Sequence, residues 1–210
     1  MGWFDFARSP TGASVDTLQL PIFPLNTVLF PGGVLPLKIF EQRYLDMAAN
    51  CMREHSPFGI CLIANGGETG LAAEPHMVGT LATIGNWEME QLGILMITAQ
   101  GGRRFRIIES SVGPDNLLTA SVELLADVVP ATLPPARKRL LPLLRRIVSD
   151  LGNERIPEPH QYDDAEWVGY RITEVLPIHN LAKQKLLELE DPLARLEILE
   201  KFLDQRNLLG

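Results

Sequence analysis

A change in hydrophobic periodicity divides this 210-residue sequence and restricts the folds that it can adopt. Up to about residue 126, apolar residues alternate with polar ones or form short runs between turn residues, which is typical of β-strands. After the proline-rich stretch "VVPATLPP" (Val128 to Pro135), apolar residues recur every three or four positions, as on one face of an α-helix. The sequence therefore predicts a β-rich part followed by a helical part.

The strand-like segments of the first part are short and closely spaced. Their sequences are the alternating Leu18, Leu20 and Ile22, then "FGICLIA" from Phe58, "VGTLATI" from Val78, "LGILMIT" from Leu92, "RRFRIIE" from Arg103 and "LLTASVELL" from Leu117. Several short strands in this arrangement favour a compact, largely antiparallel sheet or barrel.

One helix is expected inside the β-rich part. Its apolar residues recur at i, i+4, i+7, i+8 and i+11 and are Phe40, Tyr44, Met47, Ala48 and Cys51. This stripe must face the sheet. The preceding residues suit a turn at 31–33 and a strand over 34–39, and Lys38, Glu41 and Arg43 lie where strand becomes helix. These charges could form a catalytic group, a ligand clamp, or an ion pair that fixes how the helix leaves the sheet.

The second part reads as a small bundle of four helices with short connections. Its first helix has an apolar stripe of Leu140, Leu143, Leu144, Ile147 and Leu151. The other three are expected to start near residues whose side chains cap helices, namely Asp163, Asn180 and Asp191. The predicted organisation is a flexible tail at 1–16, a β-rich domain at 17–127 and an α-helical domain at 128–210.

Composition excludes some classes of function. The net charge of −7 disfavours a nucleic-acid partner, because neutralising phosphates needs a concentrated basic surface. Cys51 and Cys61 form no CxxC pattern and are expected to be reduced thiols of a cytoplasmic protein. We expect no membrane segment, since no apolar run approaches about 18 residues. The aromatic cluster Trp3, Phe4 and Phe6 is expected to pack on the protein or fray, with a partner hook as the alternative.

Motifs that carry chemistry are missing from the sequence. It has neither a GxxxxGK[ST] phosphate loop nor a GxSxG nucleophile elbow. The four histidines lie far apart, without the paired spacing of a zinc site. The acidic Asp163, Asp164 and Glu166 suit helix capping better than cation binding. We therefore predict no catalytic, cofactor-binding or metal-binding residue.

A basic strand, "GGRRFRIIE", offers two interpretations. In a strand, Arg104 and Arg106 would project from the face opposite Phe105 and Ile107. Paired arginines suit carboxylates or phosphates. They equally suit a structural ion pair, in which Arg104 or Arg106 meets Glu41. We expect Glu41 or Arg43 to pair across the junction of strand and helix.

The order and spacing of several motifs resemble those of a known family. The stretch "LPIFPLNTVLFPGGVLPLKIFEQRYLDM", followed by "FGICLI", "VGTLATI" and "GGRRFRI", is similar to the N-terminal substrate-recognition domain of the ATP-dependent protease Lon. The later "LPIHNLAKQKLLELEDPLARLEILEKFL" is similar to the helical part that follows in that family. The resemblance extends from about Leu18 to about Leu203.

The resemblance implies an α+β fold. Its β half would be a pseudo-barrel of the PUA-like kind with one inserted helix, shared with the N-terminal region of cereblon and with RNA-binding modules, and a helical bundle would follow. The family implies recognition of protein substrates, especially exposed hydrophobic segments of unfolded or damaged chains. Neither an ATPase signature nor a Ser-Lys peptidase signature accompanies it, so the resemblance implies no enzymatic activity here.

We therefore expect a stand-alone Lon-type domain that binds polypeptide in protein quality control and presents it to a protease or chaperone. The candidate residues for polypeptide binding are Phe23, Leu25, Phe30, Tyr44 and Phe105, although core packing would account for each taken singly. An RNA-binding module using Arg103, Arg104 and Arg106 is the alternative. A small-molecule hydrolase ranks last, because no pair of nucleophile and base is visible.

Overall fold

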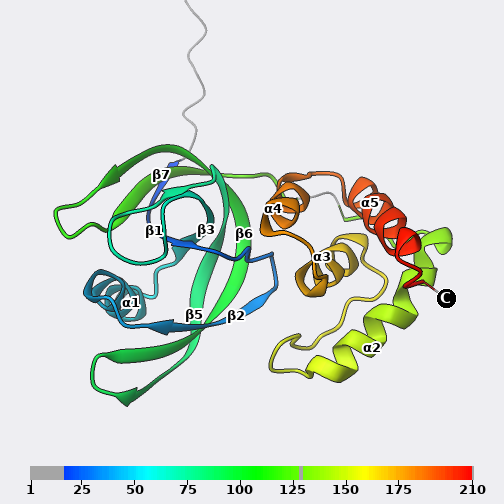
Figure 1. The fold of residues 1–210 in the computed structure, drawn as a ribbon, viewed down its shortest axis with the longest axis horizontal. Coiled ribbons are helices and arrows are strands. Elements are labelled where there is room, and N and C mark those ends of the chain that lie inside the picture. The colour runs from blue at the N-terminus through cyan, green and yellow to red at the C-terminus, as the bar shows by residue number, and fades with distance from the viewer. Residues whose placement is uncertain (1–16, 128–129, 210) are drawn as a thin grey trace, which may run out of the picture.

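The computed structural model describes residues 17–127 and 130–209. The tail predicted at 1–16 lies outside the described residues, and so do positions 128 and 129 at the predicted boundary. The described part has the predicted α+β fold, in which a β pseudo-barrel with one inserted helix precedes a group of helices (Figure 1).

The elements follow one another in an order that matches the change in periodicity. The strands are β1 (Thr17–Leu25), β2 (Val34–Ile39), β3 (Phe58–Asn65), β4 (Glu74–Pro75), β5 (Val78–Gln91), β6 (Ile94–Val112) and β7 (Leu118–Leu124). The helices are α1 (Gln42–Glu54), the short 3-10 helix η1 (Pro135–Leu140), α2 (Leu141–Leu151), α3 (Ala165–Val175), α4 (Asn180–Glu188) and α5 (Pro192–Gln205).

Five strands close the pseudo-barrel, in the order β1, β7, β6, β5, β3 and back to β1. The contact between β1 and β3 is parallel, whereas the other pairs in the ring are antiparallel. The 19-residue β6 is long enough to pair with β5, β7 and β2. Strand β2 is therefore an extension of the ring and not a member of it.

Helix α1 packs on the sheet through the predicted stripe. Tyr44, Met47, Ala48 and Cys51 are all buried. Phe40, which we also assigned to this stripe, is instead 56% exposed. The backbone is still extended at Glu41, the residue that precedes the first turn, so the helical period begins after Phe40. The prediction for Phe40 was wrong because a change of period does not mark the helix start to within two residues.

The helices form their own core, and α3 and α5 have side-chain caps, whereas α4 starts at the predicted cap residue Asn180 itself and has no side-chain cap. Asp191 caps α5 by accepting a 2.8 Å hydrogen bond from the backbone nitrogen of Leu193, as expected. The cap of α3 is Asp164, one position after the predicted Asp163. The residues of the helical core are Leu133, Leu140, Leu144, Val148, Ile156, Ala165, Val168, Ile172, Leu176, Leu186, Leu196, Leu199 and Leu203.

The helical part packs against the pseudo-barrel through α3 and α4, while α2 and α5 lie farther from the sheet (Figure 1). Phe30 and Tyr170 meet in this contact with ring centroids 5.4 Å apart. The buried amide of Gln184 donates a 3.0 Å hydrogen bond to the carbonyl oxygen of Val78. No helix in the described part of the chain is long and apolar enough to span a bilayer.

Candidate functional site

Beyond the closed ring of five strands, the sheet is interrupted between the end of β1 and β2. Strand β7 pairs with β1 only through residues 17–22, so the end of β1 has no partner on that edge. Strands β2 and β7 pair with the same edge of β6, β2 along its first part and β7 along its last part, while β5 pairs with the opposite edge. Strand β2 pairs with no other strand among residues 17–127 and 130–209. Two strand edges without strand partners therefore remain, one on β1 and one on β2.

A groove of about 270 Å³ lies between these edges. Its lining residues are Phe23, Leu25, Thr27, Leu35, Pro36, Leu37, Lys38, Ile39, Phe40, Glu41, Tyr44, Glu68 and Thr69. They include every residue from 35 to 40, although side chains of consecutive strand residues point to opposite faces. The groove therefore runs along the edge of β2 and not over one of its faces. We call it the β1–β2 groove.

Aromatic rings form part of the lining of the β1–β2 groove. The rings of Phe23 and Tyr44 stack with centroids 4.1 Å apart and an angle of 23° between their planes. Burial raises the pKa of the Tyr44 hydroxyl, with Arg43 acting in the opposite direction, so this side chain stays neutral at physiological pH. With Leu25 and Leu37 beside the rings, the groove offers an apolar surface to a ligand.

Charged residues lie at the rim of the β1–β2 groove. Glu41 forms an ion pair of 3.0 Å with Arg43 and accepts a 3.3 Å hydrogen bond from the backbone nitrogen of Gly70. Glu68 accepts a 2.6 Å hydrogen bond from the backbone nitrogen of Asn26. The loop after β3 is thus held against both the start of α1 and the end of β1.

Arg43 connects the groove to the turn between β6 and β7. Its guanidinium is buried, lies 4.5 Å from the centroid of the Tyr44 ring and donates a 2.8 Å hydrogen bond to the carbonyl oxygen of Asn116. Since Glu41 is also paired with it, Arg43 holds together the start of α1, a groove aromatic and the turn between β6 and β7. Its contacts are those of a structural residue.

The structure brings together three of the five residues proposed for polypeptide binding. Phe23, Leu25 and Tyr44 all line the β1–β2 groove, although each is at most 6% exposed and also belongs to the core of the barrel. Phe30 is fully buried against Tyr170, and Phe105 is fully buried in a separate core cluster. Neither Phe30 nor Phe105 lines the groove, because both fill the interior.

The arginines of β6 do not act together. Arg104 is buried and donates hydrogen bonds to the carbonyl oxygens of Leu187, at 2.8 Å, and Leu189, at 3.3 Å. Arg106 is exposed, and Arg103 pairs with Asp127 at 2.9 Å. Glu41 is paired with Arg43, while Arg104 meets the end of α4, where helix carbonyls lack partners within the helix. A sequence cannot reveal this contact, since the two segments are more than 80 positions apart.

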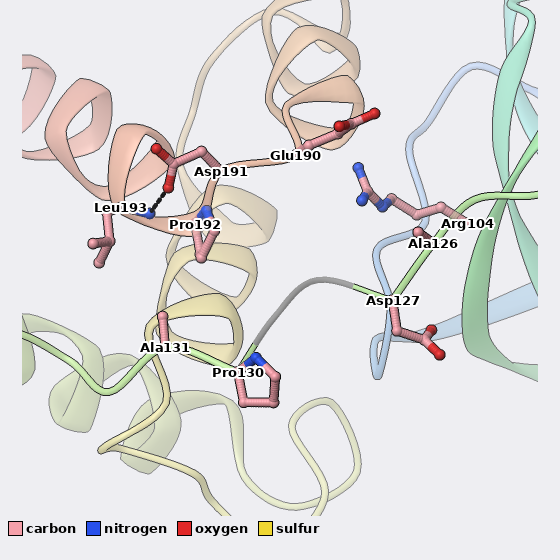
Figure 2. Close-up of a pocket in the computed structure, with 9 residues that line it drawn as sticks. All are labelled: Arg104, Ala126, Asp127, Pro130, Ala131, Glu190, Asp191, Pro192 and Leu193. Carbon is pink, nitrogen blue, oxygen red and sulfur yellow. Dashed lines mark hydrogen bonds between the residues drawn. The ribbon is translucent and has the colours of Figure 1, made fainter.

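A cleft with a volume of about 470 Å³ lies between the pseudo-barrel and the helices (Figure 2). Three of the charged residues that line it are already used. Arg104 bonds the end of α4, Asp191 caps α5, and Asp127 pairs with Arg103. These groups hold elements of the protein together, so we do not take this cleft as the functional site.

Sequence reasoning missed an exposed apolar surface on the β5–β6 hairpin, which extends beyond α1 (Figure 1). Trp87 is 60% exposed, Met89 49% and Leu92 94%. Trp87 pairs with Ile97, which in turn pairs with Leu37 in the groove. The only sequence signal for this surface is the apolar, polar, apolar order of residues 87–89, which predicts a strand with one apolar face. That order does not show whether the apolar face packs in the core or is exposed.

Comparison with protein families identifies the chain. Residues 19–205 match the substrate-binding domain of ATP-dependent protease La, or Lon. The chain belongs to the Lon substrate-binding domain family. The match covers most of the chain, and neither the ATPase nor the protease domain of Lon was found in it.

Solved and curated relatives agree with this assignment. The crystal structure of a Lon N-terminal domain protein from Xanthomonas campestris is similar with a TM-score of 0.73 and 34% identity, covering 88% of this chain and 98% of that one. Lon protease from Cytophaga hutchinsonii is 28% identical over 195 residues, 89% of this chain and 24% of its own length. Protein cereblon from Gallus gallus is 29% identical over 119 residues, 54% of this chain and 26% of its own length. This Lon-type chain thus spans about a quarter of these two curated relatives.

Proposed function

We propose that this protein is a non-enzymatic recognition module that binds unfolded or damaged polypeptides through extended apolar segments. The observation that carries the proposal is the β1–β2 groove, which has apolar side chains and a charged rim and lies between two strand edges without a strand partner in the described part of the chain. Membership of the Lon substrate-binding domain family supports protein substrates as the class of ligand.

Strand addition is the mode of binding that suits this groove. An extended peptide can hydrogen-bond to a free strand edge while its side chains enter neighbouring pockets. Pro36 has no N–H group to donate, and a proline in a strand fits where its nitrogen faces away from the paired strand. In β2 the paired strand is β6, so the nitrogen of Pro36 is expected to face the groove. By alternation, the backbone N–H of Lys38 is expected to face the groove as well. With few backbone donors on this edge, affinity must come largely from apolar burial.

The expected affinity is modest. Burying one large apolar side chain contributes roughly 1.5–3 kcal/mol, so two or three client side chains contribute roughly 3–9 kcal/mol. Ordering the client opposes this gain. Dissociation constants in the range of about 10–1000 μM follow, with little sequence specificity. Such binding suits exposed hydrophobic segments in many different clients.

The exposed hairpin residues offer a second contact for the same client. Trp87, Met89 and Leu92 lie on the hairpin that is paired with β2 through β6. A client that continues past the end of β2 would meet them, and contact at two places increases avidity without a tighter groove. We place the protein in cytoplasmic quality control, where it would present its clients to a protease or chaperone.

The arrangement of arginines weighs against RNA as the ligand. Arg104 is buried at the end of α4, and Arg103 is paired with Asp127, so only Arg106 of the three is exposed without an ion pair among the described residues. One free arginine in a protein with a net charge of −7 is a weak basis for phosphate contacts.

Fluorescence anisotropy with a labelled, reduced and carboxymethylated protein tests the proposal. The unfolded protein should bind, its native form should not, and Phe40→Ser should weaken binding about tenfold or more because it removes an exposed groove side chain. Leu181→Ser is the matched control, since Leu181 in α4 is also 56% exposed but lies outside the groove. Absence of binding to the unfolded protein, or equal loss in both variants, would contradict the proposal.

A further inference from the structure

The β1–β2 groove fits a segment of the same chain. We infer that residues 3–6, the sequence Trp-Phe-Asp-Phe, occupy this groove in cis and compete with clients. The inference rests on the proposed function of the groove, which it extends by naming a built-in competitor. These residues lie outside the described part of the structure, so the argument uses their chemistry, the length of chain that connects them to β1, and the groove itself.

The segment has the chemistry of the proposed clients. Three of its four residues are aromatic, whereas aromatic residues make up 7% of the whole chain. In an extended conformation Phe4 and Phe6 lie on one side and Asp5 on the other. A peptide added along a strand edge presents its side chains in this alternation. The segment can therefore place two phenyl rings in the groove and keep its carboxylate outside.

The groove complements both sides of this segment. The exposed ring of Phe40, with the half-buried Leu35 and Leu37 beside it, provides an apolar surface for Phe4 or Phe6. Lys38 on the rim is exposed and forms no ion pair with any residue among 17–127 and 130–209. An ammonium group at this position suits Asp5, since opposite charges at a rim favour the correct register of a bound strand.

The connecting chain is long enough to reach the groove. Strand β1 starts at Thr17, and the part of β1 that lines the groove, residues 23–25, begins six residues later and ends eight residues later. That distance is about 20–26 Å at about 3.3 Å per residue. Phe6 precedes Thr17 by eleven positions, which span up to about 36 Å when extended. The aromatic residues can therefore reach the groove of their own chain.

Competition in cis has a predictable size. A short flexible connection gives an effective concentration of about 1 mM. If the isolated segment binds with a dissociation constant of about 100 μM, within the range expected for the groove, the segment weakens client binding by about tenfold. Removing its aromatic rings should restore the intrinsic affinity of the groove.

The test uses the 210-residue chain with the double substitution Phe4→Ser and Phe6→Ser. Its dissociation constant for the labelled, carboxymethylated protein should be about tenfold lower than that of the unsubstituted chain. Val15→Ser, which removes an apolar side chain from the same 16-residue segment, should have no effect. An unchanged or higher dissociation constant in the double variant would overturn the inference.

A labelled synthetic peptide of residues 1–9, MGWFDFARS, separates this inference from the proposed function. It should bind the double variant about tenfold more tightly than the unsubstituted chain, and adding Phe40→Ser to the double variant should weaken that binding about tenfold or more. If the peptide fails to bind while the unfolded protein binds, the inference is overturned and the proposed function stands. If the peptide binds while the unfolded protein does not, the proposed function fails, competition with clients fails with it, and only the occupation of the groove by residues 3–6 stands. The difference in client affinity between the unsubstituted chain and the double variant should not depend on protein concentration. If this difference increases with protein concentration, a second copy of the chain supplies the segment, and binding in cis is overturned.

Discussion

Arg171 in α3 donates a 2.7 Å hydrogen bond to the carbonyl oxygen of Pro31, at the turn that precedes β2. The same buried guanidinium also bonds the carbonyl oxygen of Gly32 and pairs with Glu174 at 3.0 Å. The helical part therefore holds the turn from which the groove strand begins. This contact makes the position of β2 depend on α3, so the helices contribute to the groove without lining it.

Replacing Arg171 should unfold the protein more readily. Arg171→Met leaves the Glu174 carboxylate and two turn carbonyls without their donor, and breaking a buried pair costs on the order of 3–5 kcal/mol. Urea denaturation measures this loss. Arg146→Met is the control, because the Arg146 side chain is 83% exposed and its change should stay within about 0.5 kcal/mol. A loss below about 1 kcal/mol for Arg171→Met would show that the turn does not depend on this contact.

Gly33 in the same turn should tolerate no side chain. A methyl group there would lie 2.1 Å from Oε1 of Glu174 and 2.9 Å from the carbonyl oxygen of Phe30. We expect Gly33→Ala to lower the free energy of unfolding by about 1–3 kcal/mol, since the backbone carbonyl cannot move away freely. Gly67→Ala has open space, with its nearest atom at 3.9 Å, and should be close to neutral. Equal thermal unfolding midpoints for the two variants would contradict this account.

The ionisation of Glu174 should make stability depend on pH. Burial raises the pKa of Glu174 from 4.5 to about 7, although Arg171 and Lys183 act in the opposite direction. Between these two values the folded state binds more protons than the unfolded state, so the contribution of Glu174 to stability decreases as the pH rises. The difference is on the order of 3 kcal/mol at most. Urea denaturation across this range should show the decrease, and Glu174→Gln should remove it. Identical pH profiles for the two proteins would exclude Glu174 as its source.

Arg43 is predicted to act on stability and not on the client directly. Arg43→Ala removes the ion pair with Glu41 and the hydrogen bond to Asn116, and should cost about 1–3 kcal/mol. Client binding should weaken only to the extent that the loss of Arg43 displaces the Tyr44 ring, which lines the groove. Chemical denaturation and anisotropy on the same sample measure both effects. Unchanged stability together with abolished binding would instead place Arg43 among the residues that contact the client.

The sequence predicts the fold well because the fold depends on periodicity. The buried face of α1 from Tyr44 to Cys51 follows from spacing, and the Asp191 cap with Pro192 behind it marks the start of α5. The stripe predicted for α2 is only partly right, because Leu144 is buried but Leu151 is 40% exposed. The exceptions lie at junctions. Phe40 has the spacing of the α1 stripe but remains in extended chain, and its exposure makes it part of the groove.

The site is less predictable because it depends on which strand edges remain unpaired. Phe23 and Phe105 both read as apolar strand residues, yet Phe23 borders the interruption between β1 and β2 and Phe105 fills the closed part of the barrel. Arg104 has the spacing of a surface residue in a strand, but the end of α4 covers it and takes its hydrogen bonds. Such long-range contacts leave no local signal in the sequence.

Photo-crosslinking from the groove tests the central claim most directly. A benzoylphenylalanine placed at Phe40 should form a crosslink with a reduced and carboxymethylated protein but not with its native form. The same group at Leu181, which is equally exposed, should form little crosslink with either. Strong crosslinking to the unfolded protein from Phe40 alone is the result that the β1–β2 groove predicts. Equal crosslinking from both positions, or from Leu181 only, would contradict the claim that this groove recognises unfolded polypeptides.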